Sequence, residues 1–190
     1  MIRRPRLLVH GLVLCGIMNT ATAPSPAFAQ RGGSDRSRAV HVQAIRKYYA
    51  RVNAEAKRYA KKERDLSGFS AEGGTLIGFY SGSELRKMVA TYYGESGRTI
   101  TELYLADGAL IFALSTDLRY VRPLGFDGKD AGKIASTAQS RFYFNKGTLI
   151  QWLDSDGKSV RTDGAAARGE SQRIRTDVAD LVRRLRLPPP

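Results

Sequence analysis

The chain has 190 residues, of which 31 are Lys or Arg and 18 are Asp or Glu, so its net charge at pH 7 is +13. Its single cysteine, Cys15, excludes a fold held together by disulfides. No apolar run approaches the roughly 18 residues that span a bilayer. About 160 residues remain beyond the N-terminal segment described next, enough to bury most of one domain's surface in a single core.

The first 29 residues have the pattern of an export signal. A basic start, with Arg3, Arg4 and Arg6, leads into an apolar run from Leu7 to Met18. Ala27-Phe28-Ala29 then has the small-x-small pattern after which signal peptidase cleaves. Cleavage would leave a mature chain that begins at Gln30 and has no cysteine. We therefore expect a periplasmic or secreted protein.

A helix is predicted at each end of the mature chain, after a flexible leader over residues 30–36. Between Arg38 and Leu66 the apolar positions recur every three or four residues, and Ser37 is a suitable N-cap. From Ser171 to Leu187 the period is clearer, and the prolines of the 188–190 tail end that helix. Its apolar stripe consists of Ile174, Val178, Leu181, Val182 and Leu185. One domain over residues 37–187 is expected.

Between the helices a hairpin pattern occurs three times. Gly74-Thr75-Leu76-Ile77, Gly108-Ala109-Leu110-Ile111 and Gly147-Thr148-Leu149-Ile150 are near copies, and the second and third each follow an aromatic, apolar run. Asp107-Gly108 is a strong turn pair because both residues accept positive φ, whereas Lys146-Gly147 relies on its glycine. Each copy is expected to begin a strand after a tight turn.

These signals predict an α+β fold with an antiparallel β-meander of six or seven strands. The two helices each have one apolar stripe, and we expect both to pack on one face of the sheet. The strands are expected near residues 75–80, 84–93, 98–106, 109–115, 140–146, 148–153 and 158–162.

The excess positive charge lies on the predicted helices. Residues 36–66 have a net charge of +7 and residues 171–187 of +3, whereas the region between them has equal numbers of the two signs. If both helices cover one sheet face, their outer surfaces form a single basic face that could capture an anionic envelope component. A solvated helix surface is the alternative. The candidate residues are Arg46, Lys47, Arg51, Lys57, Arg58, Lys61, Lys62, Arg173, Arg175, Arg183, Arg184 and Arg186.

Recognised catalytic patterns are missing from the sequence. His41 is the one histidine of the mature chain, so no histidine pair for a metal and no His–Cys couple exists, and we predict no metal or cofactor. Asp154-Ser155-Asp156-Gly157 resembles the start of a calcium loop but lacks the acid that would close it, and a turn is expected there. Carboxylate pairs remain an alternative, with Glu102, Asp117, Asp127 and Asp130 as candidates.

Successive aromatic residues, as in Tyr92-Tyr93 and Phe142-Tyr143-Phe144, place apolar side chains on both faces of the sheet. A binding module would use the face away from the helices, or a groove beneath the loop from Pro123 to Gln139. We therefore expect an exported, non-catalytic bacterial envelope protein that binds an anionic component or another envelope protein. A small carboxylate-dependent hydrolase is the alternative. Nucleic acid is not favoured, because the standard binding motifs are absent, and the oligomeric state is not predicted.

Overall fold

The computed structural model describes the backbone of residues 26–68, 70, 72–125 and 130–188, and the side chains from residue 35 onward. Residues 1–25, which hold most of the predicted export signal, lie outside the described part. None of the described helices is long and apolar enough to cross a membrane. The elements are α1 (Pro26–Glu55), a 3₁₀ turn η1 (Ala56–Arg58), β1 (Ala60–Asp65), β2 (Gly74–Ser81), β3 (Glu84–Gly94), β4 (Gly97–Ala106), β5 (Ala109–Tyr120), β6 (Ile134–Asn145), β7 (Thr148–Leu153), β8 (Ser159–Val160) and α2 (Ala165–Arg186).

The predicted α+β meander is confirmed, with eight strands in place of six or seven. All eight form one antiparallel sheet in chain order, from β1 at one edge to β8 at the other. The hairpins β4–β5 and β6–β7 turn at Asp107-Gly108 and Lys146-Gly147, and all four of these residues have positive φ. Lys146 therefore shares the left-handed conformation with its glycine, a conformation that is costly for a residue with a Cβ atom.

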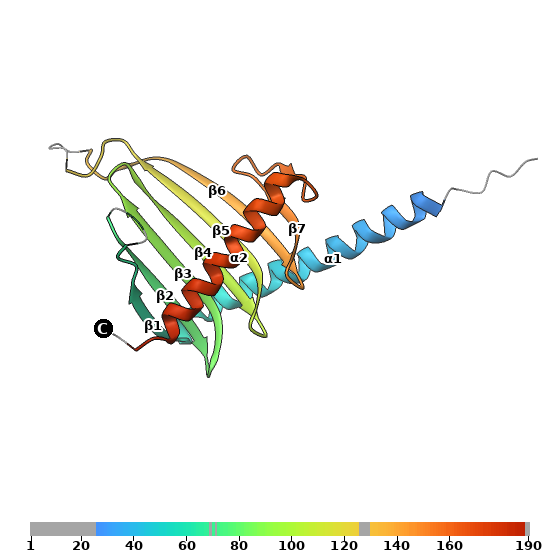
Figure 1. The fold of residues 1–190 in the computed structure, drawn as a ribbon, viewed down its shortest axis with the longest axis horizontal. Coiled ribbons are helices and arrows are strands. Elements are labelled where there is room, and N and C mark those ends of the chain that lie inside the picture. The colour runs from blue at the N-terminus through green and yellow to red at the C-terminus, as the bar shows by residue number, and fades with distance from the viewer. Residues whose placement is uncertain (1–25, 69, 71, 126–129, 189–190) are drawn as a thin grey trace, which may run out of the picture.

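The two helices cover opposite faces of the sheet, so the prediction that they share one face is wrong (Figure 1). α2 contributes Ile174, Leu181 and Leu185 to a core that also contains Met88 and Leu103. α1 packs on the other face in a second core, formed by Val42, Ile45, Val52, Tyr104, Phe112, Leu114 and Tyr143. We call these two sides the α2 face and the α1 face.

The physical reason for two cores is visible in the strand sequences. Neighbouring residues of a strand point to opposite faces, so the run Phe142-Tyr143-Phe144 supplies two rings to the α2 face and one to the α1 face. The repeated Leu-Ile pairs act in the same way, because Leu110 and Leu149 pack in the α2-face core and Ile111 and Ile150 in the α1-face core. A sheet that is apolar on both sides needs a cover on each, and the chain provides one helix for each face.

The largest error in the predicted elements concerns the first helix, which ends at Glu55 and not at Leu66. Residues 60–65 form the edge strand β1, whose sequence AKKERD is charged along most of its length. Such charges protect a sheet edge from pairing with other chains. The helix also begins earlier than predicted, at Pro26, so it includes the segment expected to be a flexible leader, and its N-terminal part extends beyond the sheet (Figure 1).

The long hairpin β5–β6 reaches further than the sequence predicted. β5 continues to Tyr120 and β6 begins at Ile134, so the loop expected from Pro123 to Gln139 is shorter. The segment 134–140 has no alternating apolar pattern, so the sequence did not predict a strand there. α2 begins at Ala165, six residues before the predicted Ser171, and its whole predicted stripe lies in or against the α2-face core.

Candidate functional site

The predicted basic residues lie on separate surfaces. Arg46, Lys47 and Arg51 are on α1, and Arg173, Arg175, Arg183, Arg184 and Arg186 are on α2, across the sheet from them. Lys57 and Arg58 lie in η1, and Lys61 and Lys62 in β1. A single continuous basic face is therefore wrong, because it required both helices on the same side.

Acidic neighbours compensate part of the charge on α2. Arg173 forms ion pairs with Glu170 and Asp177, at 2.6 and 2.7 Å, and Arg183 pairs with Asp180 at 2.8 Å. These pairs are three or four residues apart on one helix and are solvent-exposed, so they are typical of a solvated helix surface. Among the described residues α2 therefore presents no concentrated anion site.

On the α1 face the helix leaves a groove beside the strands β5 to β7. Its apolar wall is formed by Ile45 and Tyr49 of α1 together with Phe112, Leu114, Tyr143 and Leu153 of the sheet. Arg46, Gln139 and Arg141 add polar groups at the same place. The cavity volume is about 410 Å³, within the range of small-molecule sites. We call this the inner cavity.

Two guanidinium groups of the inner cavity have no acidic partner among the described residues. Arg46 lies 5.8 Å from the centroid of the Tyr143 ring, a cation–π contact. Arg141 donates to the side-chain oxygen of Gln139 at 3.0 Å, and no described carboxylate lies within ion-pair distance of it. Beside an apolar wall, two such cations favour a ligand that carries an anionic group next to an apolar one.

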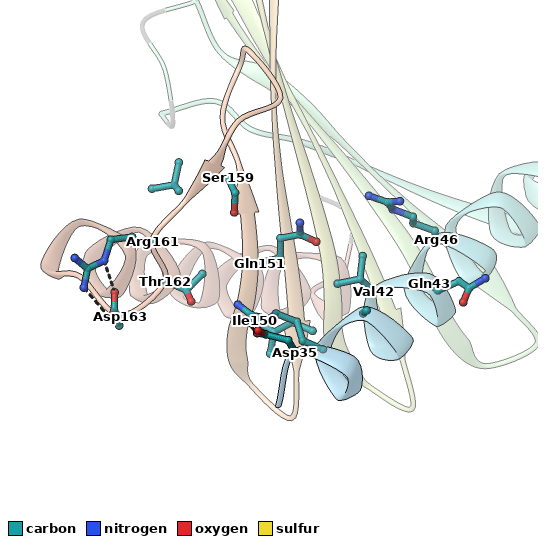
Figure 2. Close-up of a pocket in the computed structure, with 13 residues that line it drawn as sticks. Asp35, Val42, Gln43, Arg46, Ile150, Gln151, Ser159, Arg161, Thr162 and Asp163 are labelled. Atoms are coloured by element: carbon teal, nitrogen blue, oxygen red, sulfur yellow. Dashed lines mark hydrogen bonds and ion pairs between the residues drawn. The ribbon is translucent and has the colours of Figure 1, made fainter. Parts of the chain in front are cut away.

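A larger outer cavity adjoins the inner one, and the two share Arg46. It has a volume of about 870 Å³ and lies between the middle turns of α1, residues 35–46, and the β7–β8 region, with Val42 and Gln43 on one side and Gln151 and Ser159 on the other (Figure 2). Its other cations are already paired, because Arg38 contacts Asp35 and Arg161 makes two hydrogen bonds to Asp163, at 3.0 and 2.9 Å. Although this cavity is the larger, its charges are neutralised, and the inner cavity offers the stronger anion site.

Beneath α1 lies a polar cluster of Asn53, Lys87, Glu102 and Tyr104. The Lys87 ammonium is 2.5 Å from a Glu102 carboxylate oxygen and donates to the Asn53 side-chain oxygen at 2.8 Å. The Tyr104 hydroxyl donates to the same Glu102 oxygen at 2.7 Å. Lys87 and Tyr104 are buried, so these contacts replace the water that their polar groups lose on folding. Through Asn53, the cluster helps to fix the position of α1 on the sheet.

Tyr104 of this cluster and the neighbouring Tyr49 are held in their protonated form. Burial raises the pKa of Tyr104 strongly, and the hydrogen bond to the Glu102 carboxylate and the charge of that group raise it further. Burial, together with the charge of Glu102, also raises the pKa of the neighbouring Tyr49. Both hydroxyls therefore stay protonated near neutral pH, and that of Tyr104 remains a donor to Glu102.

The candidate carboxylates are not brought together. Glu102 is paired with Lys87, Asp117 accepts a hydrogen bond from Thr99, and Asp130 faces Lys133 at 3.6 Å. Asp127 lies outside the described residues. Within the described ranges no cluster of three acidic, histidine or cysteine side chains could hold a metal ion, and Asp154 caps its own turn by accepting backbone N–H groups of Asp156 and Lys158.

Sequence reasoning missed Arg141, which stands in a strand whose neighbours are aromatic and whose charge is not part of any run. It also predicted a sheet face free of helices, which does not exist, since α1 and α2 cover one face each. What remains open is the part of the α1 face that the helix does not reach. Comparison with protein-family models, with curated proteins and with solved structures finds no match to this chain.

Proposed function

We propose that the protein is an exported, non-catalytic binding module of the bacterial envelope, and that the inner cavity takes an anionic amphiphile. The ligand has an apolar group that lies on Phe112, Leu114 and Leu153, and an anionic group that Arg46 and Arg141 contact. The observation that carries this proposal is the pair of guanidinium groups without a described acidic partner beside an apolar wall.

The anionic group is inferred from the position of the two cations. Arg46 is exposed and Arg141 half-buried, and both lie at the apolar wall without a described carboxylate, so an oxyanion beside that wall can contact both. Arg46 and Arg141 are left for a ligand, and charge-assisted hydrogen bonds to an oxyanion contribute about 1.5–3 kcal/mol each. Export is supported by the basic and apolar start and by the Ala27-Phe28-Ala29 pattern.

The test uses 8-anilinonaphthalene-1-sulfonate, which joins an aromatic group to a sulfonate, as a fluorescent probe of the mature chain. The double variant Arg46→Gln, Arg141→Gln should lower the affinity for the probe by roughly 100-fold, because each lost contact is worth about tenfold. An uncharged aromatic probe of similar size should bind the parent weakly and be insensitive to the substitutions.

A matched control removes two exposed arginines from α2, with Arg183→Gln and Arg186→Gln. It changes the net charge by the same amount and leaves the α1 face intact, so its affinity for the sulfonate probe should equal that of the parent. Circular dichroism melting establishes that each variant is folded. If the parent and the double variant Arg46→Gln, Arg141→Gln bound the sulfonate probe equally well, the inner cavity would not be an anion site.

A further inference from the structure

The sheet has an open edge on β6. β7 pairs with β6 only over Arg141–Asn145, whereas β5 pairs with β6 from Ile134 to Tyr143. The stretch Ile134–Ser140, which we call the open edge, therefore has a strand on one side and no described strand on the other. Residues 134–138 are all exposed, and Ile134 has 45% of its surface accessible.

The open edge lacks the charges that protect an edge strand. Its sequence, IASTAQS, has no charged residue and no proline, whereas β1 at the opposite side of the sheet carries five charges in six residues. A protein normally blunts an exposed edge with Lys, Pro, a bulge or a covering loop. The pairing of β6 with β5 shifts register once near the start of the open edge, between Arg119 and Tyr120. From Ser136 to Ser140 the pairing with β5 is regular.

Unpaired backbone groups make this edge a template for another strand. In an antiparallel sheet, alternate residues of an edge strand direct their N–H and C=O groups away from the neighbouring strand. An extended peptide can add to such an edge through main-chain hydrogen bonds, and its side chains then meet the surface on either face. Here Gln139 and Arg141, at one end of the open edge, are also part of the inner cavity.

The charges around the open edge indicate the chemistry of the occupant. Arg141 follows the open edge at one end, and Lys133, 3.6 Å from Asp130, precedes it at the other. Arg119 and Arg122 lie across β6 from the open side, on β5 and just beyond it, and Asp117, opposite Ala138 on β5, accepts a hydrogen bond from Thr99. Among these described residues the positive groups outnumber the negative ones. An incoming strand therefore meets positive potential, which favours one that carries carboxylates.

The same charges disfavour a second copy of this chain. Antiparallel pairing of the open edge with itself would bring the Lys133 end of one copy beside the Arg141 end of the other, so like charges would meet at both ends. Like charges on adjacent strands destabilise the pair.

We propose that β6 binds an extended, acidic segment of a partner protein, which adds to the sheet along Ile134–Ser140 as a further strand in line with β7. This interaction shares Gln139 and Arg141 with the amphiphile site of the inner cavity, but it does not require a ligand there. The main-chain hydrogen bonds supply the affinity, and the positive charges at the two ends of the open edge, Lys133 and Arg141, select for carboxylates in the incoming segment.

The experiment uses the synthetic peptide acetyl-Thr-Glu-Val-Glu-Val-Glu-Thr-amide as the probe. Amide hydrogen exchange of the mature chain should slow at alternate residues of 134–140 when the peptide is present, and exchange in α2 should not change. A peptide with the same side chains but N-methyl groups on alternate amides cannot form the ladder and should bind at least tenfold more weakly. A peptide with Lys in place of Glu should also bind more weakly.

Two neighbouring substitutions provide the test on the protein side. Ser136→Pro and Thr137→Pro each remove one backbone N–H, and because successive residues alternate, one of these N–H groups points away from β5. That variant should melt like the parent and lose peptide binding. If both variants unfold, the N-methylated peptide decides the question alone.

Unchanged exchange at residues 134–140 with a saturating concentration of the peptide, or equal binding of the N-methylated peptide, overturns the proposal. Sedimentation that shows a dimer of the parent, lost in the folded proline variant, would assign the open edge to a second copy and would likewise overturn it. Failure of these tests leaves the response of the amphiphile probe to Arg46→Gln and Arg141→Gln unaffected, so the two proposals fail separately.

Discussion

Lys87 and Glu102 are the pair on which the α1-face core depends most. Their side chains are 11% and 22% exposed. Lys87 also donates to Asn53, and Glu102 also accepts from Tyr104. In such a site the attraction between the charges offsets their loss of hydration, and removing one partner leaves a charge without compensation.

We expect Lys87→Met to lower the free energy of unfolding by about 2 kcal/mol, because it leaves the partly buried Glu102 carboxylate with the Tyr104 hydrogen bond but without its cation. Adding Glu102→Gln should recover part of this loss. Urea denaturation measures both variants. Lys158→Met, in an exposed pair with Asp156, is the control and should change stability by less than about 1 kcal/mol. If Lys87→Met and Lys158→Met lowered the free energy of unfolding by the same amount, the structural role of the Lys87–Glu102 pair would be contradicted.

Tyr104 makes the stability of the protein depend on alkaline pH. Its pKa is raised in the folded state, so as the pH rises above about 10 the unfolded chain loses this proton while the folded chain keeps it. The stabilising contribution is complete below the unfolded pKa and declines above it, by about 1.4 kcal/mol per pH unit for one group. Tyr104→Phe should therefore show a shallower decline between pH 10 and 11.

Urea denaturation at pH 8, 10 and 11 gives the slopes for parent and variant. Tyr49 and Tyr92, whose pKa values burial also raises, leave some decline in the variant. Tyr93→Phe, which removes an exposed hydroxyl from the same sheet, is the control. Parallel curves for the parent and Tyr104→Phe would show that the Tyr104 proton is not linked to folding.

At the scale of elements, the hairpins connect the sheet through turns that differ in how well their residues suit them. Asp107-Gly108 and Lys146-Gly147 adopt the same pair of positive φ angles, 51° and 76° in the first and 48° and 77° in the second. Aspartate tolerates this conformation better than lysine does, because its short polar side chain bonds to the nearby backbone.

Lys146→Asn should therefore stabilise the protein, by about 0.5–1 kcal/mol, since Asn-Gly is the preferred pair for this turn. Lys146 is exposed, so the substitution disturbs no packing. Asp107→Asn at the equivalent position starts from a suitable residue and should change little. Thermal melting of both variants makes the comparison, and a lower melting temperature for Lys146→Asn would contradict the strain assigned to this turn.

At the scale of the whole molecule, the sheet separates the positive charge into two surfaces. A flat anionic membrane can meet the α1 side or the α2 side, but not both together. When the two sides bind as alternatives, the total association constant is the sum of the constants of the two modes. On one continuous face, by contrast, the free energies of the cations would add, at about 1 kcal/mol each near an anionic surface, so their effects on the association constant would multiply.

This difference predicts how charge removal affects binding to vesicles rich in phosphatidylglycerol. Arg46, Lys47 and Arg51 of α1 changed to Gln should lower the association constant by about half if the two modes are equal, and so should Arg175, Arg183 and Arg186 of α2 changed to Gln. The variant with all six substitutions should lose binding to the vesicles. Vesicle sedimentation at low ionic strength measures all three, and a loss of more than tenfold in either triple variant would show that one surface dominates.

The sequence by itself determined the parts of the fold that depend on local periodicity. The apolar stripe from Ile174 to Leu185 was sufficient to predict α2, and the turn residues with their Leu-Ile pairs predicted the hairpins, because a helix or a tight turn is specified by residues a few positions apart. The consecutive aromatic residues at 142–144 also showed that both sheet faces are apolar. The chain alone did not show what covers the second face.

Only the tertiary structure decided which face each helix takes, where the first helix gives way to a strand, and which residues meet in the inner cavity. A helix with one apolar stripe fits either side of a sheet that is apolar on both, so the side depends on distant contacts such as those of Asn53 with Lys87. Residues 60–65 lie in a strand because β2 lies beside them, a pairing that their own charged sequence does not favour. Arg46 and Arg141 are 95 positions apart in the sequence and become neighbours only when α1 crosses β5 and β6.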